Sequence, residues 1–447
     1  MNPHVFRAYD IRGIAARDLD DAFVRDLGRA FATVVRRGAG RRVAVGRDCR
    51  LSSDRIFAAL AAGLRAGGAD VIDLGVVSSP VLYWAVHHFG TDGGVQITGS
   101  HNPPAHNGFK LMLGTETLHG EAITELRRII EAEAFASGSG AQLEVAPLGA
   151  YVDDIASRVH VARPLKIVVD AGNGTGGPAA LALLERLGVE VVPLYTDMDG
   201  RFPNHHPDPT VEENLVELQD TVLAEGADLG VAYDGDADRI GVIDDLGRVL
   251  WGDRLLILLA REVLAEHPGA AIVGEVKCSQ TLFEEVAASG GRPIMSQVGH
   301  SLIKARMKAE GALLAGEMSG HIFYADRWYG FDDAVYVTAR LLEILGRNDA
   351  PLSALLADVP SPHVTPEIRV ACPDEVKFDV VTRAIAHFKR HHPVIDIDGA
   401  RVDFGDGWGL IRASNTQPVL VLRAEAVDAS ALDRIRATLE GFVRDAQ

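Results

Sequence analysis

The chain has 447 residues, more than one hydrophobic core normally supports, so we expect several domains. Hydrophobic residues make up 47% of the sequence, which excludes disorder of the chain as a whole. The formal net charge of −18 disfavours non-specific binding to nucleic acids and to anionic membranes, although a local basic cluster could still hold a small anion.

The three cysteines, Cys49, Cys278 and Cys372, do not suffice for a disulfide framework, which indicates a reducing compartment. The first residues lack a basic segment followed by an apolar one, so we expect no secretory signal. The apolar stretch 255–260 is too short to span a bilayer. We therefore predict a cytoplasmic protein with neither a membrane nor a nucleic acid as partner.

Segments with strand and helix patterns alternate along the chain, as is typical of α/β proteins. Apolar residues at helical spacing predict a helix over residues 20–36, and residues 42–46 have the pattern of a buried strand. A Ser/Asp start signal predicts a helix over residues 53–65, and residues 71–74 have the pattern of a second strand.

The order strand, polar loop, helix, glycine, strand recurs at residues 43–74, 167–194 and 271–297. This recurrence indicates three copies of one supersecondary unit at domain-scale separation. Each copy places a polar loop at the carboxyl end of a strand, where open α/β sheets bind ligands. The loops contain Arg47, Asp48, Asn173 and Lys277.

The last segment, from about Pro366, has a different pattern. A strand and a helix over residues 378–390 precede two short strands that are joined through residues 403–407. An amphipathic helix over residues 430–444 ends the segment. We expect seams between domains near residues 137–140, after Asp245 and at residues 359–362.

Asp234, Asp236 and Asp238 lie between two strand-like runs. In an extended segment their side chains would point to one side and could converge on one ion. All-oxygen ligation suits Mg²⁺, Ca²⁺ or Mn²⁺ rather than zinc, and the segment lacks the residues of an EF-hand loop. A solvated acidic turn is the alternative, but three anions packed between strands repel one another unless a cation offsets them.

Ser100 follows the strand-like run 94–97, on a loop that Pro103 and Pro104 stiffen. A serine hydroxyl is a weak nucleophile and needs a base, a metal or an activated electrophile. His101 is its neighbour in sequence, but neighbours on a strand point apart, so it need not be that base. A simple turn is the alternative interpretation.

Two further polar loops are candidate binding sites. Residues 412–416 combine a guanidinium, two hydroxyls and an amide, a set that suits a phosphate dianion, unless they form only a polar turn before the strand 419–422. Residues 316–321 offer a carboxylate, a hydroxyl and an imidazole that could bind sugar hydroxyls, unless the loop is merely solvated.

Two other patterns have competing interpretations. Residues 172–177 match the glycine spacing of dinucleotide-binding loops, and Asp197 follows at a suitable distance, but we favour a tight strand-to-helix turn. The histidine pairs at 87–88, 205–206 and 391–392 lack cysteine or glutamate partners at metal spacing, so we expect no zinc site.

Taken together, these loops resemble those of the α-D-phosphohexomutase family, most closely its bacterial phosphomannomutase/phosphoglucomutase branch. The matching motifs run nearly from end to end in the order of the family: Tyr9–Gly13, Thr98–Pro104, Asn107–Lys110, Phe202–Pro209, Asp234–Arg239, Gly299–Ser301, Gly316–His321 and Arg412–Thr416. Eight motifs in one order make the resemblance highly specific.

The resemblance implies an α/β fold class, with three similar α/β domains with mixed sheets plus a C-terminal α+β cap domain around a central cleft. We expect the domains at residues 1–146 with the phosphoserine loop, 147–247 with the metal-binding loop, 248–360 with the sugar-recognition loop, and 361–447 with the phosphate-binding loop.

The resemblance also implies roles for individual residues. The expected catalytic residues are Ser100 as phosphoserine, His101, Lys110, Arg239 and His300, with Lys110 and His300 as candidates for proton transfer. The expected substrate-binding residues are Tyr9, Arg12, Lys277, Glu317, Ser319, His321, Arg412, Ser414, Asn415 and Thr416. The expected metal ligands are Ser100, Asp234, Asp236 and Asp238.

The activity that the resemblance implies is interconversion of hexose 1-phosphate and hexose 6-phosphate, of mannose, glucose or both, through a bisphosphorylated sugar. Mg²⁺ is the expected cofactor, hexose 1,6-bisphosphate the activator, and a monomer or weak homodimer the assembly. Gln297, His106 and Gln417 depart from the family's usual residues at flanking positions, and they bear on sugar preference or rate rather than on the reaction.

Two other functions compete with this interpretation. A metal-dependent phosphatase would use the same aspartates, with Asp234 as nucleophile, and would release free phosphate. A non-catalytic nucleotide-binding protein would use residues 172–177.

Overall fold

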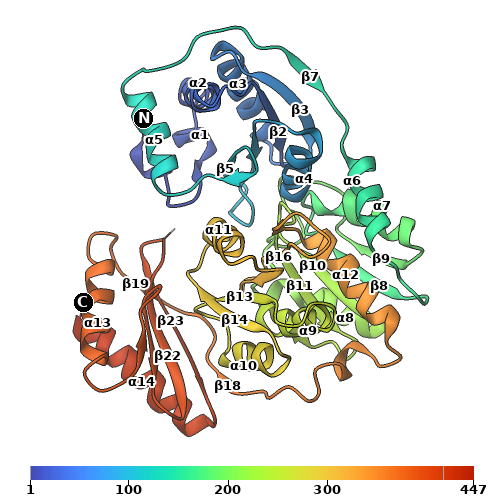
Figure 1. Ribbon diagram of the computed structural model, residues 1–447, viewed down its shortest axis with the longest axis vertical. Helices are drawn as coiled ribbons and strands as arrows, with labels where there is room; N and C mark the ends of the chain where they lie inside the picture. Colours follow the sequence, from blue (N-terminus) through green and yellow to red (C-terminus); the bar gives the residue numbers. More distant parts are fainter. Residues whose placement is uncertain (1, 416, 447) are drawn as a thin grey trace.

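The structure is a computed structural model that describes residues 2–415 and 417–446. Figure 1 shows four units, each built around its own sheet. In the described part of the chain, none of the helices combines the length and the apolar character that a membrane crossing requires.

The first unit is a seven-stranded mixed sheet with the strand order β1-β5-β4-β2-β3-β7, in which β6 pairs with β5. Its elements are η1 (Pro3–Val5), β1 (Ile11–Ile14), α1 (Ala15–Asp18), α2 (Asp21–Arg37), β2 (Arg42–Arg47), α3 (Ser53–Ala66), β3 (Asp70–Val76), α4 (Ser79–Phe89), β4 (Gly93–Ile97), β5 (His106–Leu113), β6 (Glu116–Thr117), α5 (Glu121–Glu131) and β7 (Gln142–Glu144). The predicted helices and strands of residues 20–74 are all present, and α2 begins where the Asp20 carboxylate accepts a hydrogen bond of 2.8 Å from Phe23 N.

The second unit has the five-stranded order β12-β11-β10-β8-β9. Its elements are α6 (Leu148–Arg158), β8 (Lys166–Asp170), α7 (Gly176–Leu187), β9 (Glu190–Leu194), η2 (Glu212–Leu215), α8 (Val216–Glu225), β10 (Leu229–Tyr233), β11 (Ile240–Asp244) and β12 (Val249–Leu250).

The third unit has the order β14-β13-β15-β16-β17. Its elements are α9 (Gly252–Glu266), β13 (Ala271–Glu275), α10 (Gln280–Ala288), β14 (Arg292–Ser296), α11 (His300–Glu310), β15 (Leu314–Gly316), β16 (Ile322–Tyr324), β17 (Phe331–Asp332), α12 (Ala334–Arg347) and η3 (Leu352–Ala354).

These three sheets share one topology. Strands β8 and β13 each pair in parallel with two neighbours, and β2 does the same with β3 and β4. One of those neighbours then pairs antiparallel with the next strand along the chain, as β4 with β5, β10 with β11, and β15 with β16. The three predicted copies of one unit are therefore confirmed, and so is the expectation of mixed sheets.

The fourth unit is an antiparallel sheet of the order β18-β23-β22-β21-β20, in which β19 also pairs with β23. Its elements are β18 (His363–Val364), β19 (Ile368–Ala371), α13 (Lys377–Phe388), β20 (Val394–Ile395), β21 (Ala400–Asp403), β22 (Gly407–Ala413), β23 (Val419–Ala426) and α14 (Ala429–Ala446). Side chains alternate along β22, so that Ile411 packs under α13 and α14 while Trp408 and Leu410 face the third unit. The expected α+β cap is thus present.

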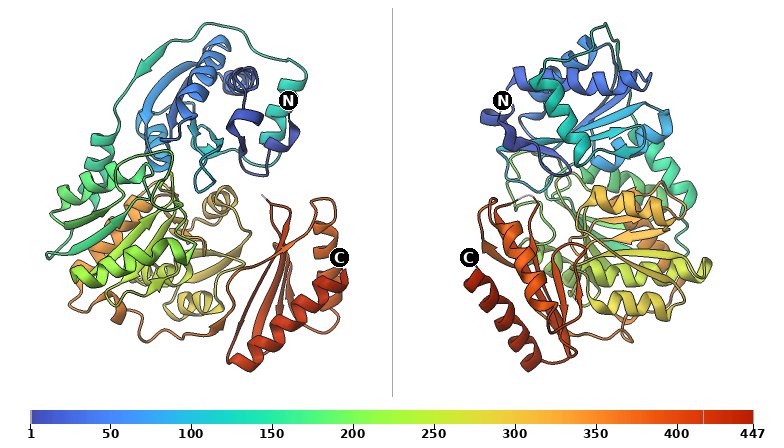
Figure 2. Two further views of the ribbon diagram at one scale, coloured as in Figure 1. Left: turned by 180° about the vertical axis from the view of Figure 1, so that it is seen from behind. Right: turned by 60° about the vertical axis from the view of Figure 1, so that its left-hand side comes forward.

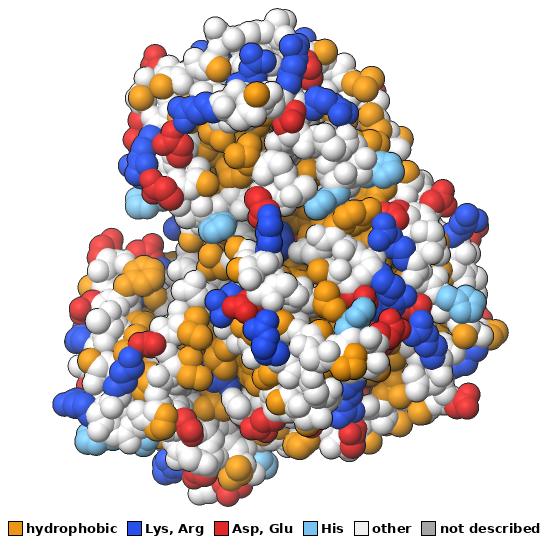
Figure 3. All heavy atoms as spheres, in the orientation of Figure 1, with side chains coloured by type: hydrophobic (Ala, Val, Ile, Leu, Met, Phe, Trp, Pro, Cys, Tyr) orange, Lys and Arg blue, Asp and Glu red, His pale blue; other side chains and the backbone are white. Residues whose placement is uncertain are grey.

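The hydrophobic cores explain how the units are joined. One continuous core runs through the three α/β units, where Trp84 of α4, Tyr151 of α6 and Leu341 of α12 belong to the same cluster. The fourth unit has a separate core, and it packs beside the third unit on the side away from the second (Figure 2). The space-filling view in Figure 3 has a notch in its outline between the first and fourth units. The precise limits of the four domains stay predictions.

Equivalent turns of the three α/β units carry the polar motifs. The segment with Ser100 joins β4 to β5, the one with Asp236 joins β10 to β11, and the one with Glu317 joins β15 to β16. Because each of these turns leaves the same strand of the repeated topology, the fold brings chemically different loops to one place.

Candidate active site

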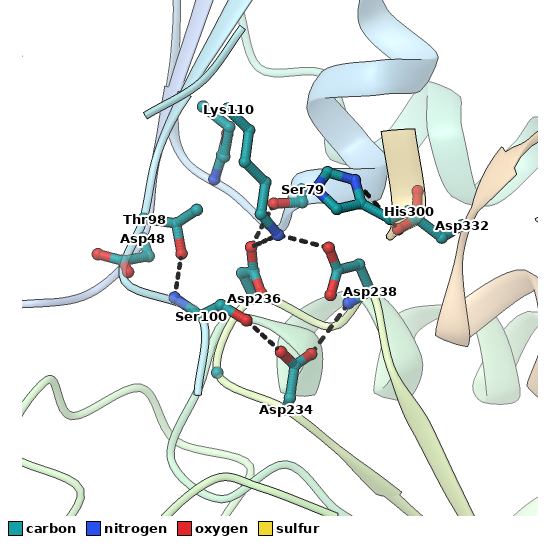
Figure 4. Close-up of polar contacts among 12 residues, drawn as sticks. Asp48, Ser79, Thr98, Ser100, Lys110, Asp234, Asp236, Asp238, His300 and Asp332 are labelled. Atoms are coloured by element: carbon teal, nitrogen blue, oxygen red, sulfur yellow. Dashed lines mark hydrogen bonds and ion pairs between the residues drawn. The ribbon is translucent and has the colours of Figure 1, made fainter. Parts of the chain in front are cut away.

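Ser100 and the aspartate turn meet although they lie in different units. Ser100 Oγ donates a hydrogen bond of 2.6 Å to Asp234 Oδ2 (Figure 4). The backbones of the two segments also lie close together, since a Cβ added to Gly235 would lie 2.5 Å from the carbonyl oxygen of Ser100. The expected meeting of the serine with the acid cluster is thus seen in the structure.

The aspartates converge through a turn and not through the extended segment that we expected. Asp234 directly follows β10, and the turn after it leads back into the antiparallel strand β11. Ala237 has a φ of 57°, and the backbone N–H groups of Asp238 and Arg239 both donate to Asp234 Oδ1 at 3.1 Å. The three carboxylates therefore converge because of this turn, and not because alternate side chains of an extended strand point to the same side.

All three carboxylates are fully buried, and they influence one another's ionisation. Burial and then the charges of Asp236 and Asp238 raise the pKa of Asp234 well above its ordinary value. Burial opposes ionisation of Asp236 too, but Lys110 outweighs it and holds the pKa of that carboxyl below its usual range. Three buried acids in contact need positive charge nearby.

The cluster fits a hard divalent cation. One oxygen from each aspartate lies within 4.8 Å of the others, and Asp236 Oδ1 and Asp238 Oδ1 have no hydrogen-bond partner among the described residues. These are oxygen ligands, and the adjacent Ser100 Oγ adds a fourth. The donor set therefore suits Mg²⁺, which we expected.

Lys110 supplies positive charge from the neighbouring unit. Its Nζ lies 2.6 Å from Asp236 Oδ2 and also forms an ion pair with Asp238 (Figure 4). The carboxylate of Asp236 accepts a further hydrogen bond from Ser79 Oγ. Burial would lower the pKa of Lys110, but Asp236 and Asp238 raise it well above its ordinary value. Lys110 is thus a protonated donor in this arrangement.

The His101 ring lies closer to Ser100 than we expected from the rule that neighbouring side chains on a strand point apart. Ser100 adopts a left-handed backbone with a φ of 48°, and as a result its Oγ is 3.2 Å from His101 Nδ1. This conformation costs a residue other than glycine about 1–2 kcal/mol, so the surrounding loop must hold it. Burial and then the charge of Arg239 lower the pKa of His101, which keeps the ring neutral.

Arg239 and His321 form a second polar group beside the aspartates. Arg239 Nε donates a hydrogen bond of 2.9 Å to His321 Nε2. A neutral imidazole that accepts at Nε2 carries its proton on Nδ1, and this atom lies 2.9 Å from Asp332 Oδ2. Asp238, His321 and Asp332 lie close enough to hold a metal, but a protonated Nδ1 is not a ligand.

Asp332 is a candidate functional residue that our sequence analysis missed. Its carboxylate is fully buried, contacts His321, and accepts a hydrogen bond of 3.0 Å from Lys304 Nζ. The His300 ring stacks against the His321 ring with centroids 5.7 Å apart, and His300 Nδ1 is 4.0 Å from the same carboxylate. The acidic pair Asp332–Asp333 between apolar residues was the signal that could have pointed to this position.

Tyr9 and Arg12 bring the N-terminal segment to the same place. The ring of Tyr9 packs edge-on against His300, with centroids 5.7 Å apart. Burial raises the pKa of Tyr9 to about 12, so its hydroxyl stays a donor. Arg12 forms an ion pair with Asp10.

The Glu317 loop is held by the third unit itself. Glu317 Oε1 accepts a hydrogen bond of 2.7 Å from Gly299 N, and its Oε2 accepts one of 3.2 Å from Ser319 Oγ. Lys277 Nζ lies 3.2 Å from Glu367 Oε2 of the fourth unit. The carboxylate of Glu317 is thus held in place by hydrogen bonds, whereas Ser319 is partly exposed.

The expected phosphate clamp lies at the hairpin between β22 and β23. Arg412 is buried and donates to Asp398 Oδ2 from Nε at 3.2 Å and from Nη2 at 3.0 Å. Ser414 Oγ accepts a hydrogen bond of 3.2 Å from Gln417 N, and Asn415 is half-buried. The predicted residue Thr416 lies outside the described residues.

The glycine-rich loop 172–177 is filled by the protein itself. A Cβ added to Gly172 would lie 2.9 Å from Pro207, and one added to Gly177 would lie 2.1 Å from Thr196 O. A Cβ on Gly174 would lie 2.7 Å from Gly235 O. The glycines serve this close packing, which supports the strand-to-helix turn that we favoured.

The family models of phosphoglucomutase/phosphomannomutase match the chain in sequence order. Their alpha/beta/alpha domain I matches residues 3–137, domain II matches 149–247, domain III matches 251–363, and the C-terminal domain matches 367–441.

Individual relatives match over nearly the full length. The chain is 46% identical over 442 residues to the phosphomannomutase/phosphoglucomutase of Pseudomonas aeruginosa, across 98% of this chain and 95% of that one. It is 46% identical over 444 residues to the phosphoglucomutase of Neisseria gonorrhoeae, across 98% and 96%. The crystal structure of a phosphoglucomutase/phosphomannomutase family protein from Burkholderia thailandensis matches with a TM-score of 0.94 and 46% identity, across 100% and 98%.

Proposed function

The chain belongs to the phosphoglucomutase/phosphomannomutase family and is a hexose-phosphate mutase, and from this premise we propose that Ser100 carries the transferred phosphoryl group. The observation that carries the proposal is the 2.6 Å hydrogen bond from Ser100 Oγ to Asp234, which places a buried hydroxyl on the acid cluster. The names of the relatives make mannose and glucose phosphates candidate substrates, and glucosamine phosphate, which differs from them by one substituent, is a third.

In the first transfer, the bond between phosphorus and Ser100 Oγ breaks while a sugar hydroxyl oxygen bonds to phosphorus. We assign the hydroxyl proton to His300, because burial lowers the pKa of that ring and leaves it neutral. The protonated Lys110 can donate to the departing serine oxygen. The hexose 1,6-bisphosphate that results then returns its other phosphate to Ser100, and supplied from outside it would act as activator.

Ser100, Asp234, Asp236 and Asp238 are the residues that would hold Mg²⁺. When bound, the cation would offset negative charge on the transferring group. Arg239 contributes a fixed positive charge beside the aspartates, and its hydrogen bond to His321 holds it in place.

The bisphosphorylated sugar must bind in two orientations, one for each transfer. In both of them the phosphate that is not transferred needs the same binding site. We propose Arg412, Ser414, Asn415 and Thr416 as this site, with Tyr9, Arg12, Lys277 and His321 around the cleft. Glu317 and Ser319 would bind the 3- and 4-hydroxyls. Adjacent equatorial hydroxyls occupy similar positions in both orientations, so one loop can serve both.

Water must be kept from the phosphoserine, since it would otherwise hydrolyse. The separate core of the fourth unit suits a cap that closes on the substrate. We place its hinge at residues 359–362, and we retain 1–146, 147–247, 248–360 and 361–447 as the proposed domains.

A coupled assay tests the function. Mannose 1-phosphate, glucose 1-phosphate and glucosamine 1-phosphate are each supplied with a bisphosphate activator, and formation of the 6-phosphate is followed together with release of free phosphate. We expect isomerisation of at least one sugar without stoichiometric phosphate release. Release that matches substrate loss would instead support a phosphatase with Asp234 as nucleophile.

A further inference from the structure

We propose that Arg50 is a positioning residue that holds the Ser100 loop in its reactive conformation, an inference that rests on the proposed role of Ser100. Arg50 follows β2 in the first unit and is not part of the motifs that carry the family resemblance. Its side chain is fully buried, so its charge must be met by the groups around it.

The guanidinium of Arg50 binds four backbone carbonyls of the serine loop. Nη2 donates to the carbonyl oxygens of Ser100 at 2.7 Å and of Asn102 at 2.5 Å. Nη1 donates to those of Pro103 at 2.7 Å and of His106 at 3.1 Å. One rigid fork thus joins four points of a loop that spans seven residues, from the proposed phosphate carrier to the start of β5.

Asp48 accepts the hydrogen bond of the fifth guanidinium donor, Nε, and its negative charge balances the positive charge of Arg50. Arg50 Nε donates to Asp48 Oδ2 at 3.1 Å, and the same oxygen accepts a hydrogen bond of 3.0 Å from Gly99 N. Asp48 Oδ1 accepts from Arg50 N at 3.0 Å and from Ser53 Oγ at 2.5 Å. All five guanidinium donors are therefore used, and Asp48 links the arginine to the residue before Ser100.

These bonds account for the left-handed backbone of Ser100. Its carbonyl oxygen points to Arg50 and its N–H donates to Thr98 Oγ1 at 2.8 Å, so both backbone groups are fixed inside the protein. With the backbone fixed in this way, the side chain is directed at Asp234. Strained conformations persist where the surroundings determine them several times over, as they do here.

The second unit covers the arginine from the other side. The ring of Phe202 lies 5.1 Å from Arg50 Cζ, and a Cβ on Gly200 would lie 2.5 Å from Arg50 Cα. Cys49 Sγ lies 3.5 Å from Asn173 O of the same unit. Arg50 is therefore enclosed between the serine loop and the unit that carries the aspartates, which fits a residue that sets the distance between them.

Arg50→Lys tests the proposal, because lysine keeps the charge but has no planar fork for four carbonyls. We expect phosphorylation of Ser100 by hexose 1,6-bisphosphate, measured in a single turnover, to slow about 10- to 100-fold, the scale of a misplaced reacting group. The KM for hexose 1-phosphate should change less than about 3-fold, since the proposed phosphate clamp is in another unit.

Arg55→Lys is the matched control. Arg55 belongs to the same unit and also donates to two backbone carbonyls, those of Ala15 and Leu19 at 3.0 Å each, but its side-chain hydrogen bonds go to these residues and to Asp21 rather than to residues 100–106. We expect its phosphorylation rate to equal that of the unaltered enzyme. A general loss of stability in the first unit would affect both variants, whereas a positioning role affects only Arg50→Lys.

Folded Arg50→Lys with a normal phosphorylation rate would overturn the proposal, as would an equal loss in Arg55→Lys. If Arg50→Lys does not fold, the phosphorylation rate of Gly99→Ala tests the proposal instead. This variant keeps the arginine but places a methyl group 2.5 Å from Arg50 Cζ, so that the guanidinium must shift. Normal phosphorylation of folded Gly99→Ala would then refute the role. Failure of the proposed function is seen separately, since the unaltered enzyme would then carry no phosphate on Ser100.

Discussion

The Lys110 ammonium lies 2.6 Å from Asp236 Oδ2, although Lys110 belongs to the first unit and Asp236 to the second. The lysine thereby brings positive charge to a cluster of three buried acids. Because one lysine does not balance three carboxylates, this relationship supports the proposal that the cluster holds a cation.

Removal of divalent cations should therefore silence the enzyme. We expect EDTA to abolish turnover and Mg²⁺ to restore it, and we expect Asp236→Asn to weaken Mn²⁺ binding by at least about tenfold in titration calorimetry, which is about 1.4 kcal/mol. Asp220→Asn, at an exposed position on α8, is the control. Full turnover in EDTA would contradict the metal role.

Arg412→Ala should weaken binding of the substrate phosphate by about 1.5–3 kcal/mol, the scale of a charge-assisted hydrogen bond. The KM for hexose 1-phosphate then rises roughly 10- to 150-fold in steady-state kinetics. Arg434→Ala, at a half-exposed site on α14 of the same unit, should leave KM unchanged. If both kcat and KM of Arg412→Ala stay normal, this loop does not bind the phosphate.

Asp332→Asn should lower kcat about 10- to 100-fold with little effect on KM. The amide can present its NH₂ to His321 Nδ1, which favours the tautomer that no longer accepts from Arg239. Stopped-flow single turnovers would place the loss in the transfer step. A variant with normal kcat would show that the proton position on His321 is immaterial.

The stability of the protein should depend on pH through Asp333. Burial raises the pKa of Asp333 to about 7 from an ordinary value of 3.8, despite hydrogen bonds from Tyr336 N and Tyr151 Oη. The folded state therefore holds the proton more tightly than the unfolded state does. The stability contributed by this proton is present in full below about pH 4 and is lost as the pH rises through about 7.

Asp333→Asn removes that titration. The midpoint of urea unfolding is measured as a function of pH for both proteins at equal ionic strength. Between pH 4 and pH 7, we expect the midpoint of Asp333→Asn to fall less than that of the unaltered protein. Parallel curves over this range would show that Asp333 does not titrate there.

The repeated topology and most element positions follow from sequence patterns, because buried strands and amphipathic helices leave periodic signals. Residues 20–36, for example, form α2 nearly as predicted. Local spacing was a poorer guide to the turns. Asp234, Asp236 and Asp238 do converge, but through the left-handed backbone at Ala237, which a strand-based argument does not foresee.

The residues that support the site were the hardest to predict. Arg50 and Asp332 act through contacts with segments distant in sequence, and an isolated arginine or aspartate has no local signal for such contacts. His101 illustrates the same limit, since its approach to Ser100 depends on the φ of 48° at the serine.

Mapping of the phosphate is the most direct measurement. The enzyme is treated with hexose 1,6-bisphosphate labelled in its phosphates, digested, and sequenced by mass spectrometry, alongside Ser100→Ala. We expect the label on Ser100 alone, its discharge to hexose 1-phosphate at a rate at least equal to kcat, and no labelling or turnover in Ser100→Ala. A label on Asp234 or on another residue, or turnover by Ser100→Ala, would contradict a phosphoryl carrier at Ser100.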